Sequence, residues 1–115
     1  MRHRREKTKL RPVSTSRAVE LIRKAQRGET NGAVMLRTAW CGWSQRAADE
    51  LEAAGVKTVE FDVEKGDEGE KRIYEKARRK LPKKSFPQIF FWSPDNLTLE
   101  YVGDGDDMRK ALLEL

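Results

Sequence analysis

The chain has 115 residues, a formal net charge of +5 and 37% charged residues. This length is enough for one domain with a single core, which needs no disulfide or structural metal to fold. There is no run of 18 apolar residues, and the basic N-terminus lacks an apolar stretch, so we expect a cytoplasmic protein without a membrane span or a secretory signal.

The positive charge is concentrated at the N-terminus. Residues 1–13 carry six basic side chains and one acidic one, so the remaining residues are neutral overall. Basic arms bind nucleic acid or other anionic surfaces in some proteins and are solvated, disordered tails in others. We expect the tail, and we divide the chain into a basic, disordered arm at 1–13 and one domain at 14–115.

The domain is expected to begin with a helix and a buried strand. Apolar residues recur at helical spacing over about 16–27, with Ser14 and Ser16 as candidate N-caps and Gly28 as the stop. The apolar run at 33–36 is short and uncapped, which is typical of a buried strand.

A second helix and a second strand follow. Helical spacing runs from Gln45 to Gly55, and apolar and charged residues alternate over 56–63. Together with the strand at 33–36, these pieces form a βαβ unit, whose first turn lies at the carboxyl edge of a parallel sheet, where open α/β folds bind ligands. Cys41 is in that turn.

The second half of the domain adds two helices around two strands. The expected elements are a mostly exposed helix at 67–80, a buried strand at 86–92 that opens with a proline, a turn at 93–96, a strand at 97–102 and a last helix after 103–107. The order α-β-α-β-α-β-β-α predicts an α/β protein with no repeats and no second domain.

Cys41 is the only cysteine, so it has no internal disulfide partner. A free cysteine is often a buried, small apolar residue, but one in a polar turn between two tryptophans is more typical of a reactive thiol. Unpaired amides at a helix start lower the pKa of such a thiol. Ser44, three residues on, is either a donor to the thiolate or an ordinary first-turn serine.

Three motifs, in this order and spacing, resemble the glutaredoxin family of the thioredoxin superfamily. Cys41-Gly42-Trp43-Ser44 is similar to the monothiol active site, in which the cysteine is followed by Gly, an aromatic residue and Ser. Ser85–Phe90 resembles the Thr-Val-Pro segment, and Val102–Met108 resembles the Gly-Gly-x-Asp-Asp stretch. The likeness spans about 16–115 and implies a thioredoxin-like fold with a mixed four-stranded sheet flanked by helices.

The resemblance also implies how glutathione is bound. Cys41 and Ser44 are the expected catalytic residues. The expected glutathione-binding residues are Arg37 for the glycyl carboxylate, Trp43 as a wall, Phe86 and Pro87 as a cis peptide whose backbone pairs with the ligand, Gly105 and Asp106 as amide donors to a carboxylate, and Asp106 or Asp107 for an ammonium group.

Asp104 departs from the family pattern, which has a second glycine at this position. The change adds a carboxylate and a Cβ beside a site that is expected to bind an anionic tripeptide. Whether glutathione binds therefore depends on Asp104.

Three functions remain in view. The first is a monothiol thiol–disulfide oxidoreductase that acts on glutathione mixed disulfides through Cys41, as a monomer. The second is a carrier in which two chains share a [2Fe–2S] cluster, each giving Cys41 and one glutathione. The third is a non-catalytic binding module that uses the basic arm to hold nucleic acid or a protein partner.

Overall fold

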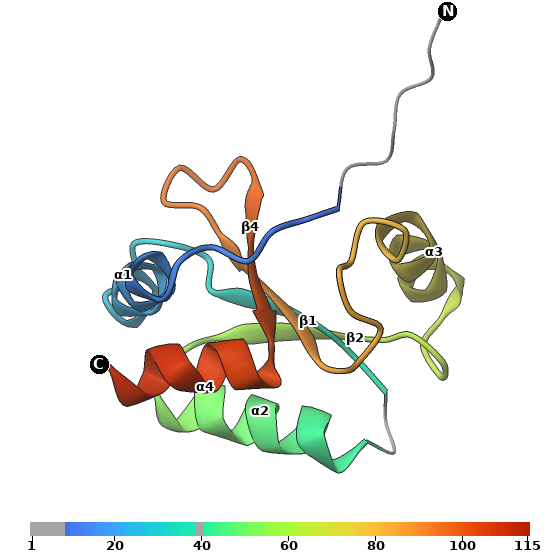
Figure 1. Ribbon diagram of the computed structural model, residues 1–115, viewed down its shortest axis with the longest axis horizontal. Coiled ribbons are helices and arrows are strands. Elements are labelled where there is room, and N and C mark those ends of the chain that lie inside the picture. Colours follow the sequence, from blue (N-terminus) through green and yellow to red (C-terminus); the bar gives the residue numbers. More distant parts are fainter. Residues whose placement is uncertain (1–8, 39–40) are drawn as a thin grey trace, which may run out of the picture.

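The computed structural model describes residues 9–38 and 41–115 (Figure 1). The elements follow the expected order: α1 (Thr15–Gln26), β1 (Ala33–Arg37), α2 (Gly42–Ala53), β2 (Thr58–Asp62), α3 (Glu68–Ala77), β3 (Gln88–Trp92), β4 (Leu99–Asp104) and α4 (Gly105–Leu113). Trp40 and residues 1–8 of the arm lie outside the described residues. Within the described part, no helix is both long and apolar enough to cross a membrane.

The four strands form one mixed sheet in the order β2-β1-β3-β4. Strands β1 and β2 are parallel, whereas β3 is antiparallel to both of its neighbours, β1 and β4. Helix α2 connects the parallel pair, so the end of β1 leads into the start of α2. The α/β fold class and the thioredoxin-like sheet are confirmed.

The two faces of the sheet are covered by different helices. Side chains alternate along β3, so Ile89 and Phe91 face the larger core, which α1, α2 and α4 complete (Figure 1). Phe90 points the other way, into a smaller cluster with Leu36 and Tyr101 that α3 covers. The larger core therefore supports both α2 and α4, the helices whose first residues carry the site.

Two apolar residues lie outside the core that their spacing predicts. Val59 is 47% exposed, because β2 is an edge strand with a neighbour on one side only. Helix α3 has no fully buried residue, as expected for a mostly exposed helix, but Ile73 faces solvent while Tyr74 packs against the smaller cluster. A capping box between Asp67 and Glu70 stabilises the first turn of this helix.

Residues 9–13, which their charge assigns to the arm, lie against the domain. The Leu10 amide donates to the Lys80 carbonyl at 2.6 Å, and the Val13 amide donates to the Tyr101 carbonyl at 2.9 Å. Leu10 packs on the smaller cluster and Val13 on the larger core. The disordered tail predicted for 1–13 is therefore wrong for 9–13, because two apolar side chains in this charged stretch pack, partly buried, against the domain.

Gly103 is required by the local backbone. Its φ is +124°, and an added Cβ would overlap the Asp107 carboxylate, which caps α4. We expect Gly103→Ala to lower the free energy of unfolding by about 2 kcal/mol, measured by urea denaturation. Gly42→Ala is the control, because a Cβ there meets nothing within 4 Å. The free energy of unfolding of this variant should stay near that of the parent. Equal stability of the two variants would contradict this account.

Candidate active site

Cys41 is the N-cap of α2, as the sequence predicts. Its backbone is extended, its amide donates to the Thr38 carbonyl at 3.2 Å, and its own carbonyl accepts the amide of Ser44 at 3.1 Å. The side chain makes no capping hydrogen bond, and the residue is partly buried. The sulfur is therefore held at the positive end of a helix dipole, where a thiolate is favoured.

Ser44 lies in the first turn of α2 and is fully buried. Among the described residues its hydroxyl oxygen has no hydrogen-bond partner, which is rare for a buried polar atom. A hydroxyl that has no other acceptor is available to donate to a neighbouring negative charge. The nearest such charge would be a thiolate at Cys41.

The surroundings of Cys41 favour its thiolate. Burial alone would raise the pKa of Cys41. Once ionised, the thiolate accepts hydrogen bonds from the Ser44 hydroxyl, from the amides of Ser44 and Trp43, and from the Thr38 side chain, and these bonds outweigh the effect of burial. The pKa of Cys41 is therefore below its ordinary value. Ser44 contributes to this shift with both its side chain and its backbone.

The segment before β3 faces Cys41. The peptide bond between Phe86 and Pro87 is cis, and the Phe86 carbonyl oxygen lies 4.0 Å from the Cys41 sulfur. The Phe86 ring points away from the sulfur and packs on Tyr74, with ring centroids 5.7 Å apart. It is therefore the backbone of Phe86, not its ring, that meets the thiol.

Gln88 fixes this segment, a role that the sequence analysis missed. Its side chain is fully buried, donates to the carbonyls of Ser85 at 2.6 Å and Lys83 at 3.3 Å, and accepts the hydroxyl of Tyr101. Burial, followed by the nearby charges of Asp104 and Asp107, raises the pKa of Tyr101 to about 12, so the hydroxyl keeps its proton. A glutamine within an otherwise apolar strand was the available signal.

Asp104 caps α4 with its own carboxylate. Oδ1 accepts the amides of Asp106 and Asp107, each at 3.1 Å, and Oδ2 accepts the Lys83 ammonium at 3.2 Å. The Asp107 carboxylate accepts the Asp104 amide in return, which completes a capping box. The Asp106 amide, expected to bind a ligand carboxylate, is thus already bonded, and the Asp107 side chain belongs to the cap.

The pKa values of the two capping carboxylates shift in opposite directions. Burial would raise the pKa of Asp104, but the bonds from the Asp107 amide and from Lys83 outweigh it and lower this pKa. Burial and the neighbouring Asp104 charge raise the pKa of Asp107. Asp104 is therefore the more readily ionised of the two carboxylates.

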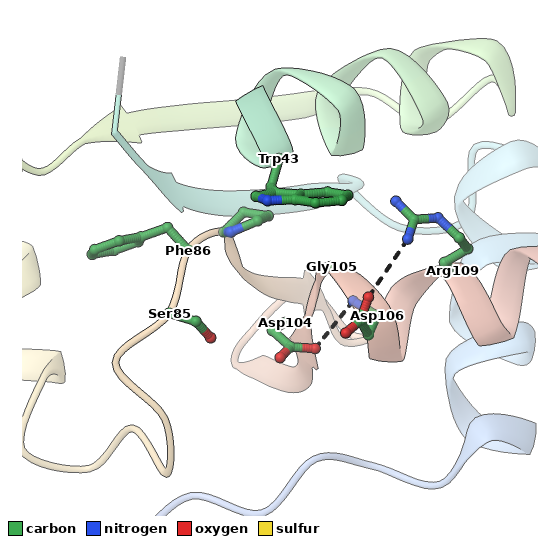
Figure 2. Close-up of a pocket in the computed structure, with 8 residues that line it drawn as sticks. Trp43, Ser85, Phe86, Asp104, Gly105, Asp106 and Arg109 are labelled. Carbon is green, nitrogen blue, oxygen red and sulfur yellow. Dashed lines mark hydrogen bonds and ion pairs between the residues drawn. The ribbon is translucent and has the colours of Figure 1, made fainter. Parts of the chain in front are cut away.

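A pocket of about 230 Å³ lies between the starts of α2, β3 and α4. Its lining comprises Trp43, Ser85, Phe86, Pro87, Asp104, Gly105, Asp106 and Arg109. Figure 2 shows the Trp43 ring on one side and Asp104, Gly105 and Asp106 on the opposite side. Trp43 is 62% exposed, so its ring is an accessible wall of the pocket.

The pocket brings together five of the predicted binding residues: Trp43, Phe86, Pro87, Gly105 and Asp106. Arg37 is not among them, because its guanidinium forms an ion pair with Glu60 across β1 and β2 and donates to the Gln45 side chain at 3.3 Å. Its predicted contact with a glycyl carboxylate gains no support from this position.

Arg109 is a lining residue that was not predicted. Its guanidinium bonds both carboxylate oxygens of Glu50 at 3.2 Å and lies 3.5 Å from the Asp106 carboxylate. The spacing of three residues from Asp106 on one helix was a usable signal.

Among the described residues, no group of three or more His, Cys, Asp and Glu side chains is arranged to hold a metal ion.

Comparison with known proteins gives one match. The family model described as Glutaredoxin matches residues 33–92. Comparisons with curated proteins and with solved structures find no match. The matched range includes Cys41, Ser44 and Pro87 and ends before Asp104, so it covers the thiol side of the pocket but not the start of α4.

Proposed function

The chain belongs to the glutaredoxin family, and from that premise we propose that it is a monothiol thiol–disulfide oxidoreductase that works through Cys41. The observation that carries the proposal is the pairing of a thiol whose pKa is lowered with a buried hydroxyl that has no other hydrogen-bond partner among the described residues. The Cys41 sulfur lies 4.0 Å from the carbonyl oxygen of Phe86, and Phe86 and Pro87 of the cis-proline segment line the pocket.

The first step exchanges one disulfide for another. The Cys41 thiolate attacks the small-thiol sulfur of a mixed disulfide between that thiol and a protein. A new bond forms between Cys41 and the small thiol, the old sulfur–sulfur bond breaks, and its electron pair leaves with the protein thiolate. The protein is thereby reduced, while the small thiol stays on Cys41.

The second step needs an external thiol. The chain has a single cysteine, and Ser44 stands where a dithiol enzyme would hold a resolving cysteine. A second small thiol, as its thiolate, therefore attacks the small-thiol sulfur of the adduct. This attack releases a small-molecule disulfide and restores the Cys41 thiolate.

Glutathione is the small thiol that the family resemblance implies. Its γ-glutamyl carboxylate would need amides at the start of α4, but those of Asp106 and Asp107 already bond to Asp104. The residues present do not fit this end of glutathione, so the two steps above are written for small thiols in general. A [2Fe–2S] cluster held by Cys41 and glutathione would need the same end to bind, which makes it the weaker alternative.

We also propose that the protein is a monomer in the cytoplasm. A reducing compartment keeps a lone thiol available for exchange. The binding module that uses residues 1–13 is ranked last, because it gives no role to Cys41 and Ser44.

The adduct tests the proposal. We expect the protein, mixed with a peptide disulfide of 2-mercaptoethanol, to release the free peptide and gain the mass of the small thiol at Cys41. Added 2-mercaptoethanol should then remove that mass. Protein alkylated beforehand with iodoacetamide is the control. Absence of the adduct, or peptide release by the alkylated protein at the parent rate, would refute the proposal.

A further inference from the structure

The start of α4 already contains the anion that it would otherwise bind. Amides at a helix N-terminus bind carboxylates because they lack partners within the helix. Here the Asp104 carboxylate takes two of them, and it also holds the Lys83 ammonium. Asp104 is only 8% exposed, so a ligand that displaced it would leave a carboxylate buried without its partners.

The charged groups that remain at the pocket favour a cation. The Asp106 side chain is 82% exposed, and its carboxylate lies 3.5 Å from the Arg109 guanidinium. Arg109 is bonded more closely to both oxygens of Glu50, but Glu50 also pairs with Arg46 at 3.5 Å, so the charge of Arg109 is compensated only in part. A ligand carboxylate would thus meet the charges of Asp104 and Asp106, against which Arg109 is the one cation among the described residues that line the pocket.

The wall opposite these carboxylates is aromatic. Figure 2 shows the Trp43 ring facing Asp106 across the pocket. The face of an indole ring attracts cations, and the Arg46 guanidinium already lies 5.7 Å from the centroid of this ring. A positive group between the two would contact a carboxylate on one side and a π face on the other.

We propose that the small thiol bound beside Cys41 is an aminothiol: a thiol whose far end carries an ammonium group and no carboxylate. This inference rests on the proposed function and narrows its substrate class. The sulfur meets Cys41, and the ammonium group lies between Trp43 and Asp106.

Three mixed disulfides of one peptide test the preference, made with 2-aminoethanethiol, 2-mercaptoethanol and glutathione. Each kcat/KM is divided by the rate at which free 2-mercaptoethanol cleaves the same disulfide, which corrects for intrinsic reactivity. We expect the normalised value to be about tenfold higher for 2-aminoethanethiol than for glutathione, with 2-mercaptoethanol between them. Higher activity with glutathione than with 2-aminoethanethiol would overturn the inference while leaving the proposed function intact.

Two variants test whether Asp104 causes the preference for 2-aminoethanethiol over glutathione. Asp104→Gly frees the two amides and is a tolerated N-cap, so we expect the glutathione value to rise until it equals or exceeds that of 2-aminoethanethiol. Asp104→Asn is the matched control: it keeps an acceptor for the amides but removes the charge, so the preference should shrink and not reverse. Circular dichroism checks that both variants fold.

The outcomes separate the two proposals. A ratio that stays at the parent value in both folded variants would overturn the role of Asp104. If Asp104→Gly does not fold, the preference of the parent for 2-aminoethanethiol over glutathione, and its size in Asp104→Asn, still test the role of Asp104. If the parent exchanges none of the three disulfides, the proposed function itself is wrong, and the aminothiol preference falls with it.

Discussion

Replacing Cys41 by serine is expected to abolish thiol–disulfide exchange, and replacing Ser44 by alanine is expected to slow it about tenfold near neutral pH. The first change removes the nucleophile, because the chain has no other cysteine. The second removes the buried hydroxyl that helps to lower the pKa of Cys41, so a smaller fraction of the protein is the reactive thiolate.

The pH dependence distinguishes this effect from a loss of packing. The alkylation rate of Cys41 by iodoacetamide should rise with pH and level off at a lower pH than for an ordinary thiol, because the pKa is lowered. In Ser44→Ala the whole curve should move to higher pH, with a plateau at least as high as that of the parent, because a thiolate of higher pKa is the stronger nucleophile. Ser16→Ala, the same substitution at an exposed site on α1, is the control. A Ser44→Ala curve that coincides with the parent would show that the hydroxyl only fills space.

The same shift links stability to pH. A thiol with a lowered pKa in the folded state stabilises that state above the pKa of the unfolded thiol, and this contribution disappears as the pH falls through the folded pKa. The free energy of unfolding of Ser44→Ala should therefore approach that of the parent on acidification, apart from any constant packing difference.

Local patterns were sufficient to predict the order of elements and the place of the thiol. Ser14 caps α1 through the Arg17 amide, and the helical spacing after it is read directly from the sequence. The buried run before Cys41 and the helix after it place the cysteine at a helix start, whatever the rest of the chain does. These features depend on neighbours in sequence, so one sequence is enough to predict them.

Contacts between distant segments could not be predicted in the same way. The Asp104 carboxylate was recognised as a departure, but its bond to Lys83 depends on how the segment before β3 folds back on β4. The ion pair between Arg37 and Glu60 follows from the register of β1 with β2, which no local pattern specifies. Leu10 packs against the smaller cluster only because α3 and β4 come together beside it.

Gln88→Leu is expected to lower the free energy of unfolding by about 4 kcal/mol. The glutamine side chain forms hydrogen bonds with three groups. Leucine removes these bonds from the Tyr101 hydroxyl and from the carbonyls of Ser85 and Lys83. Tyr101→Phe is the matched variant, because it breaks only the hydroxyl bond, and it should cost about 1–2 kcal/mol. Urea denaturation of the two single variants and the double variant gives the coupling between the residues.

Gln88 also acts on the site through the segment that it anchors. Its bonds to the Ser85 and Lys83 carbonyls hold the chain that presents Phe86 to Cys41, and these bonds survive in Tyr101→Phe. We therefore expect Gln88→Leu to raise the KM for a mixed disulfide more than Tyr101→Phe does, with the alkylation rate of Cys41 unchanged in both. A parallel fall in alkylation rate would mean that Gln88 acts on the thiol itself and not by positioning the segment that faces it.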